Sequence, residues 1–222
     1  MADYESILKD KKNQLIRKSL QMSVFVGAPS LAIVDETALF TAATGVIKAL
    51  PTGYEDLGWT TTDGAQFSRS VTSSDVTSAG STEPTRSDIT ADTTTMQVSA
   101  QETKLLTLGI YTGADLSSYV TEDPNGSITV QQSSKPIARY YRVLGIGVDD
   151  TDDGEFYLVR SMPRAKVSDF ADQALNNGDD PALWGFTFQA FEDSVAGYAN
   201  AYMLGGPGCK ALAVEMGATL GT

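Results

Sequence analysis

The chain has 222 residues, and none of them is histidine. This absence excludes a Ser-His-Asp triad, a Cys-His dyad and any histidine-ligated metal site. The chain also has a single cysteine, Cys209, so no disulfide can form within it and its fold does not depend on oxidation. Cys209 follows the sequence GGPG, and we interpret it as a small buried side chain rather than a reactive thiol.

The motifs of nucleotide-binding and hydrolytic enzymes are missing as well. There is no Walker loop, no Rossmann glycine pattern, no set of paired cysteine ligands and no nucleophile elbow. The acidic stretch 149–154 differs from a calcium loop, because Thr151 occupies a ligand position and Arg160 stands where a bidentate glutamate is needed. Adjacent carboxylates such as Glu192 and Asp193 would point to opposite faces of a strand, a poor arrangement for acid–base catalysis. We therefore expect no enzymatic activity, no cofactor and no metal.

Basic residues are scarce. The chain has 16 of them against 28 acidic residues, a net charge of −12, which argues against a basic patch that binds nucleic acid but does not exclude DNA nearby. The charge is uneven, because residues 1–18 contain five basic and three acidic residues and carry a net +2. A basic N-terminal segment on an acidic body favours self-assembly through complementary charge.

No hydrophobic run is long enough to cross a membrane. The longest, around residues 22–34, is interrupted by Gly27 and Pro29. Acidic residues near the N-terminus (Asp3, Glu5 and Asp10) argue against a signal peptide. The chain is 41 % hydrophobic, sufficient for a packed core, and its length is typical of one large all-β domain.

What the chain has instead is a long stretch, residues 57–111, rich in serine and threonine. Short alternations of apolar and polar residues run through it and predict strands with one buried and one solvated face. Phe67, Arg69 and Val71 share one face, and Met96 and Val98 alternate with polar neighbours in the same way. The solvated faces carry hydroxyl and amide groups rather than lysine or glutamate.

A helix is expected directly after these strands. Residues 99–102, with the sequence SAQE, resemble a capping box, and Leu105, Leu106 and Ile110 follow at helical spacing. Gly109 or Gly113 would end the helix.

Further strands are predicted on both sides of this stretch. We expect a bent strand within 22–34, a hairpin of 118–121 with 127–132, a second hairpin of 139–148 with 155–161, and strands at 166–170 and 183–191. In the last of these, Trp184, Phe186 and Phe188 share one face, which predicts a core rather than a base-stacking surface. The chain after Gly197 reads as an irregular tail. Residues 3–20 read as a weak helix, which is either a frayed terminus or an arm that docks on a neighbouring subunit.

The run GYEDLGWTTTDGAQFSRSV…PTRSDIT…TTTMQVSAQETKLLTLGIYTGA resembles the major tail tube proteins of long-tailed bacteriophages, particularly those of actinobacterial hosts. The resemblance is dense over residues 50–114 and looser over 135–204, around RSMPRAKVSDF and WGFTFQAFEDS. It implies subunits whose inner sheets join into a closed ring, commonly a hexamer. It also implies that the rings stack into a hollow tube through which the genome passes.

The expected fold is therefore all-β: a β-sandwich or barrel of two packed antiparallel sheets with one short flanking helix. We divide the chain into an N-terminal arm (1–21), the tail tube domain (22–196) and a C-terminal tail (197–222) that packs on its own or a neighbouring subunit. The expected partners are further copies of the chain, other tail proteins at the tube ends, and double-stranded DNA that passes without specific binding. The expected location is the virion tail, assembled in the host cytoplasm. The alternative function is that of a monomeric or trimeric β-sandwich adhesin. A head or sheath component of the same virus is a further alternative that is structurally closer to a tail tube protein.

Two groups of candidate residues follow. For the lumen of the tube, an acidic wall would repel phosphate and let DNA slide, and the candidates are the acids expected in polar strands: Asp63, Asp75, Asp88 and Asp92. For assembly, the candidates lie in the basic arm and near the expected loop 78–84: Ile7, Leu8, Lys11, Lys12, Leu15, Glu83 and Arg86.

Deletion of residues 1–18 is predicted to weaken assembly while leaving the monomer folded, because the arm would contact a neighbouring copy. Circular dichroism of the monomer and electron microscopy of the assembled protein measure the two effects. Unimpaired tube formation by this truncation would contradict a role of the arm between copies.

Overall fold

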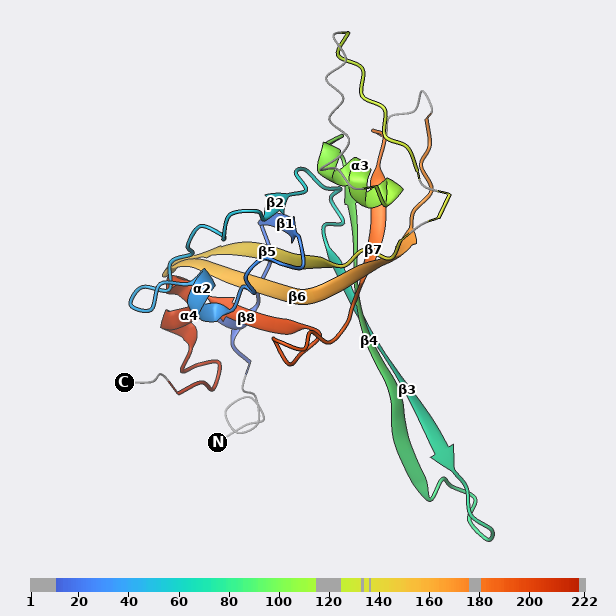
Figure 1. Cartoon of the computed structure of the whole chain (residues 1–222). Coiled ribbons are helices and arrows are strands. Elements are labelled where there is room, and N and C mark those ends of the chain that lie inside the picture. The colour runs from blue at the N-terminus through green and yellow to red at the C-terminus, as the bar shows by residue number, and fades with distance from the viewer. Residues whose placement is uncertain (1–10, 115–124, 133, 136, 176–180, 220–222) are drawn as a thin grey trace.

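The computed structural model describes residues 11–114, 125–132, 134–135, 137–175 and 181–219. Within these ranges the chain is mostly β, with a few short helices, as the sequence predicts (Figure 1). The elements in chain order are η1 (Asn13–Leu15), β1 (Gln21–Gly27), α2 (Glu36–Leu39), β2 (Glu55–Asp56), β3 (Gln66–Val76), β4 (Arg86–Ala100), α3 (Leu105–Thr112), β5 (Tyr141–Thr151), β6 (Gly154–Phe170), β7 (Trp184–Ala190), β8 (Ala201–Gly205) and α4 (Pro207–Leu212).

All strands belong to one hydrogen-bonded antiparallel sheet. Its order is β2-β1-β5-β6-β7-β4-β3, and β8 pairs with β6 off this path. The long strand β6 links two halves: its first part pairs with β5 and β8, and its last part, from Ala165 to Phe170, pairs with β7. A register shift between Val167 and Asp169 lies in that last part, and such irregularities bend a strand.

The two halves of the sheet fold over a common core. Val24 and Val143, from β1 and β5, pack in one cluster with Val98, Phe186 and Phe188, from β4 and β7, although these strands are not all neighbours in the sheet. This arrangement agrees with the expected sandwich. The described part of the chain also has helices α2 and α4, which the sequence did not predict.

A second buried cluster lies beneath α2. It combines Leu39 and Phe40 with side chains of β5, β6 and β8, and the rings of Phe40 and Tyr157 stack with their centroids 5.8 Å apart. The approach is close: a side chain on Gly205 would meet the ring of Phe40. Burial and the neighbouring carboxylate of Glu155 raise the pKa of Tyr157 to about 12, so its hydroxyl stays neutral.

The helix expected after residue 102 is present, but it begins differently. Ser99 remains in β4, and the N-cap of α3 is Lys104, whose backbone N–H donates to the Thr107 hydroxyl at 3.0 Å. The capping box at 99–102 is thus wrong, because pairing with β7 continues as far as Ala100. The expected end is confirmed: Gly113 adopts φ 66°, the left-handed conformation that favours glycine.

Three other expectations need correction. Residues 127–132 form no strand, and their proposed partner 118–121 lies outside the described residues. The chain after Gly197 is regular rather than irregular, because β8 pairs with β6 and α4 packs beside it. Residues 11–20 contain only the three-residue 3-10 helix η1 instead of the longer helix expected, and residues 3–10 lie outside the described part.

The strand expected within 22–34 is present only as β1, which ends at Gly27, and residues 28–34 form no strand. The other strand predictions named here are confirmed. The hairpin of 139–148 with 155–161 is β5 and β6, and the strand expected at 166–170 is the end of β6. The strand expected at 183–191 is β7, with Phe186 and Phe188 buried. Residues 78–84 form the loop between β3 and β4.

Candidate assembly surfaces and channel face

The hairpin of β3 and β4 projects from the body as a two-stranded ribbon (Figure 1). From residue 70 to residue 92 every side chain is exposed. The two strands are joined by their backbone pairing and by the ion pair of Arg69 on β3 with Asp92 on β4 at 2.5 Å, and a second ion pair, Arg86 with Asp88 at 2.6 Å, lies within β4. The hydrogen bond from Arg69 holds the pKa of the Asp92 carboxyl below its usual value. Isolated two-stranded ribbons are marginal in water, and this one is anchored to the body sheet only at its root, where β4 pairs with β7.

At the root of this ribbon, β3, β4, β7 and the end of β6 form a sheet with two distinct faces. Paired residues of neighbouring strands point to the same face. One face carries an apolar row, which belongs to the core: Phe67, Met96, Phe188 and Val167. The opposite face carries polar rows, of which one is Gln66, Gln97, Thr187 and Asp169 and the next is Ser68, Thr95, Gln189 and Lys166. On β3, β4 and β7 these rows contain hydroxyl and amide groups and no charge.

The four lumen candidates do not share one face. Asp88 pairs with Ser74, which alternates in step with Gln66 and so continues the polar face onto the ribbon. Asp92 and Asp75 lie on the opposite face, because they pair with or alternate in step with Val71. Asp63 lies in a turn before β3 and not in a polar strand, which corrects the expectation for that residue.

Among the described assembly candidates of the arm, Lys12 contacts the chain's own body: its ammonium donates to the Glu215 carbonyl at 3.4 Å. Lys11 is exposed and Leu15 is half-buried. Ile7 and Leu8 lie outside the described residues.

The next residues of this segment hold it more firmly. Arg17 forms an ion pair with Asp149 at 3.2 Å, largely shielded from solvent, and its guanidinium lies 5.0 Å from the centroid of the Phe156 ring. A truncation that ends before Arg17 therefore separates the arm from this internal contact better than deletion of residues 1–18 does.

The other two assembly candidates lie at the outer end of the ribbon. Glu83 is exposed in the loop between β3 and β4, and Arg86 begins β4 and is paired with Asp88 of its own chain. The charge of Arg86 is therefore partly satisfied before any second copy binds.

An exposed tryptophan, Trp59, lies on the same edge as β3 and was not singled out from the sequence. Its side chain is 78 % exposed. Its backbone is held on both sides: its N–H donates to Glu102 Oε1 at 2.7 Å, and its carbonyl accepts from Gln101 N–H at 2.8 Å. Gly58 has φ +87°, and a side chain there would meet the Glu102 carboxylate. An exposed indole on a firmly held backbone is typical of a protein contact surface.

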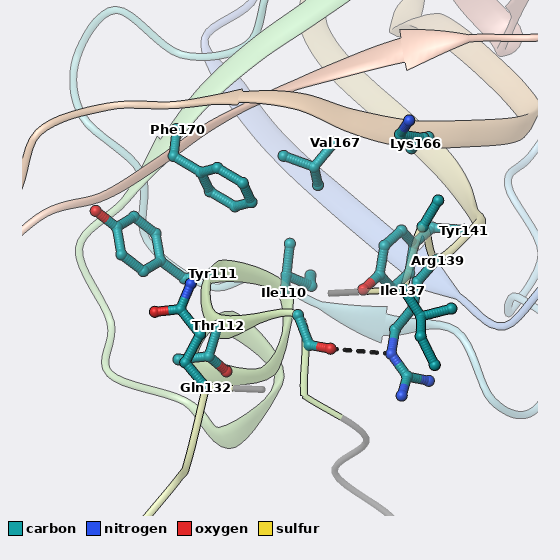
Figure 2. A pocket seen from close by; sticks show the side chains of 12 residues that line it. Ile110, Tyr111, Thr112, Gln132, Ile137, Arg139, Tyr141, Lys166, Val167 and Phe170 are labelled. Carbon is teal, nitrogen blue, oxygen red and sulfur yellow. Dashed lines mark hydrogen bonds between the residues drawn. The ribbon is translucent and has the colours of Figure 1, made fainter. Parts of the chain in front are cut away.

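A pocket of about 570 Å³ lies between α3 and the end of β6 (Figure 2). Phe170 and Val167 point from β6 toward Ile110 of α3, and Tyr111 lies at one side. At the other side the Arg139 Nε–H donates to the Gly113 carbonyl at 3.1 Å. The pocket is mainly apolar, with Arg139, Lys166 and Gln132 also in its lining, and these side chains form no catalytic grouping.

No cluster of three or more metal-ligating side chains occurs in the described part of the chain. None of its described helices is long and apolar enough to cross a membrane. Cys209 is half-buried rather than fully buried, and this burial raises the pKa of its thiol, which lowers its reactivity.

A family model described as "Phage tail tube protein" matches residues 24–203. The chain belongs to this phage tail tube family. It is thus a structural protein of the virion tail, in a family that builds a tube from repeated copies, and not an enzyme. A solved structure described as "Crystal structure of Hcp protein" matches with a TM-score of 0.33 and 11 % sequence identity, over 82 % of this chain and 97 % of that one. Among curated proteins no match was found.

The Trp59 amide is predicted to exchange its hydrogen faster in the variant Glu102→Ala, because Glu102 accepts a hydrogen bond from it. This hydrogen bond is the largest cause that lowers the pKa of Glu102 below its usual 4.5, and the hydrogen bond from the Lys104 ammonium is the second. Because the pKa of Glu102 is lowered in the folded chain, its ionised carboxylate stabilises the fold at pH values above its unfolded-state pKa. This stabilisation is lost as the pH falls through the folded-state pKa. Hydrogen exchange measured by mass spectrometry tests this, with Glu83→Ala as an exposed control. Equal protection of Trp59 in both variants would contradict the role of Glu102.

Proposed function

We propose that the chain assembles into closed rings of six copies, which stack into a hollow tube with an electronegative lumen for passage of the genome. The observation that carries the proposal is the two-faced sheet formed by the end of β6 with β7, β4 and β3. Its apolar face is covered by the core, and its polar face carries Gln66, Gln97, Thr187 and their neighbours. We assign this polar face to the wall of the channel.

The free edges of this sheet support ring closure. In the described residues no strand pairs with the outer side of β3, and none pairs with the outer side of 166–170 in β6. The four strands alternate in direction, so β3 of a neighbour would run antiparallel to β6. Head-to-tail pairing of this kind generates a ring when the rotation closes, and closure removes the free edges.

The composition of the channel face supports passage of DNA without binding. Hydroxyl and amide groups hold water, and the face has no cluster of basic residues: Lys166 is balanced by Asp169, and Arg86 by Asp88. The chain carries −12 in total, and a ring multiplies this charge by the number of its copies. The face itself is close to neutral and offers DNA few contacts close by, whereas the net negative charge of the whole ring makes the lumen electronegative and repels phosphate at a distance.

The ribbon and the two ends of the chain are proposed as contacts between copies. The ribbon extends beyond the body of its own subunit, so a neighbouring copy is the surface on which it would lie. We keep the division into arm (1–21), tube domain (22–196) and tail (197–222) as part of this proposal. The actinobacterial host remains a prediction from the sequence resemblance, and so do the contacts with other tail proteins at the tube ends.

Electron microscopy of the purified intact chain, at increasing concentration, tests the proposed assembly. We expect hollow tubes or stacked rings, and image averaging to show six-fold symmetry. Uniform monomers or trimers at all concentrations would overturn the proposal in favour of the adhesin alternative.

The variant Gln97→Lys is predicted to make assembled tubes retain short double-stranded DNA at low salt, because every ring gains one positive charge per copy on the channel face. The retention should decline steeply as salt rises. Co-sedimentation with a labelled duplex measures it. The control Val195→Lys adds the same charge at an exposed position outside the sheet, and equal retention by both variants would contradict the assignment of the channel face.

A further inference from the structure

Arg160 lies where the ribbon leaves the body of the subunit. Its guanidinium is held between two aromatic rings, 4.2 Å from the centroid of Phe67 on β3 and 3.7 Å from that of Tyr202 on β8. Phe67 also covers Gly145, which pairs with Arg160 and whose missing side chain makes room for the Phe67 ring. The stacked arrangement holds the cation in one orientation at the root of the ribbon.

This arginine has no acidic partner in the described part of the chain. Its Nε is buried without a hydrogen-bond acceptor, whereas its two terminal nitrogens reach the surface, and no described oxygen accepts from them. Arg69, on the same side of the ribbon, is paired with Asp92, and Arg17 is paired with Asp149. Burial lowers the pKa of Arg160, which reflects the cost of desolvating a charge that has no counter-ion.

Exposed apolar side chains continue from Arg160 along both β8 and the ribbon. Tyr202 is 65 % exposed and Leu204 is 46 % exposed, and both lie on the face of β8 that Arg160 shares. Val71 and Ile89, 49 % and 71 % exposed, lie on the face of the ribbon that Phe67 shares. Phe67 of the ribbon and Tyr202 of β8 both stack on Arg160, and the ribbon and β8 run in diverging directions (Figure 1). Away from Arg160, the ribbon face that carries Phe67 and the β8 face that carries Tyr202 are exposed within the described part of the chain.

We propose that this surface, formed by Arg160, Tyr202, Leu204, Val71 and Ile89, is a docking site for a second copy of the chain. In the docked state an acidic side chain of that copy pairs with the terminal nitrogens of Arg160, and apolar atoms cover the rim. The inference rests on the proposed assembly into a tube.

Three observations favour a second copy as the occupant. The family builds its tubes from repeated copies. The chain carries 28 acidic residues against 16 basic ones, so carboxylates are plentiful on any approaching copy. On the ribbon, the apolar rim also continues the face whose Phe67 packs against the core, and such faces of sheets are stable when another layer covers them.

The variant Arg160→Met tests the role of the charge, because methionine keeps an apolar stem between the two rings. We expect the monomer to unfold at the same denaturant concentration as the wild type or a higher one, because an unpaired charge is removed. The concentration needed for assembly should rise about tenfold or more, the loss expected for a central interface residue. Arg160→Lys should restore part of the assembly.

The matched control is Arg69→Met, which removes a neighbouring arginine whose charge is already paired within the chain. It should change assembly less than Arg160→Met does. Assembly of Arg160→Met at the wild-type concentration, or equal impairment by the two variants, would overturn the inference.

A second measurement needs no substitution. Phenylglyoxal modifies accessible arginines, and mass spectrometry locates the modified residues. We expect Arg160 to react in the monomer and to be protected in assembled tubes. Tubes in which Arg160 reacts as fast as in the monomer would sink the docking site and leave the proposed function intact. Failure of the intact chain to form rings or tubes would instead overturn the proposed function, and this inference with it.

Discussion

The alternation of apolar and polar side chains across β6, β7, β4 and β3 is the constraint on which the rest of the structure depends. Each residue of the row from Phe67 to Val167 is in register with a buried partner, so every intervening residue must face the other way. A shift of one residue would move the core face outward and the polar face inward. The same strands therefore close the core and present an uncharged polar surface, and neither property can change alone.

The net charge of each face of the ribbon depends on which acids are paired with arginines, and not only on how many acids the face carries. Asp88 and Asp92 carry formal negative charge, but each is held by an arginine on the same ribbon, so they add little net charge to either face. Arg160 is the opposite case, an arginine held by aromatic rings without an acid from the described chain. Unsatisfied groups in a subunit made for assembly point to contacts that only a second copy can supply, as do its free strand edges and uncovered ribbon.

The ribbon and the N-terminal segment are both extended, but they differ in how firmly the rest of the subunit holds them in position. The segment is anchored by Arg17, which pairs with Asp149 and lies over Phe156, so its position is decided within the subunit. The ribbon is anchored only at its root, and beyond Ser70 all of its side chains are exposed. Its regular pairing and internal ion pairs keep it extended, and its direction follows from the packing of Phe67 against Gly145 and Arg160.

The sequence by itself determined the strands with strict alternation, the turn at Gly113, the absence of histidine chemistry and the family, because these depend on local pattern and composition. Tertiary structure decided the rest. Ser99 continues a strand instead of capping a helix because β7 pairs beside it, and the chain after Gly197 forms β8 because β6 offers it an edge. The distribution of the candidate acids over two faces follows from strand register, and the stacked Arg160 joins residues far apart in the chain. Contacts between distant segments leave no local pattern, so only the folded chain reveals them.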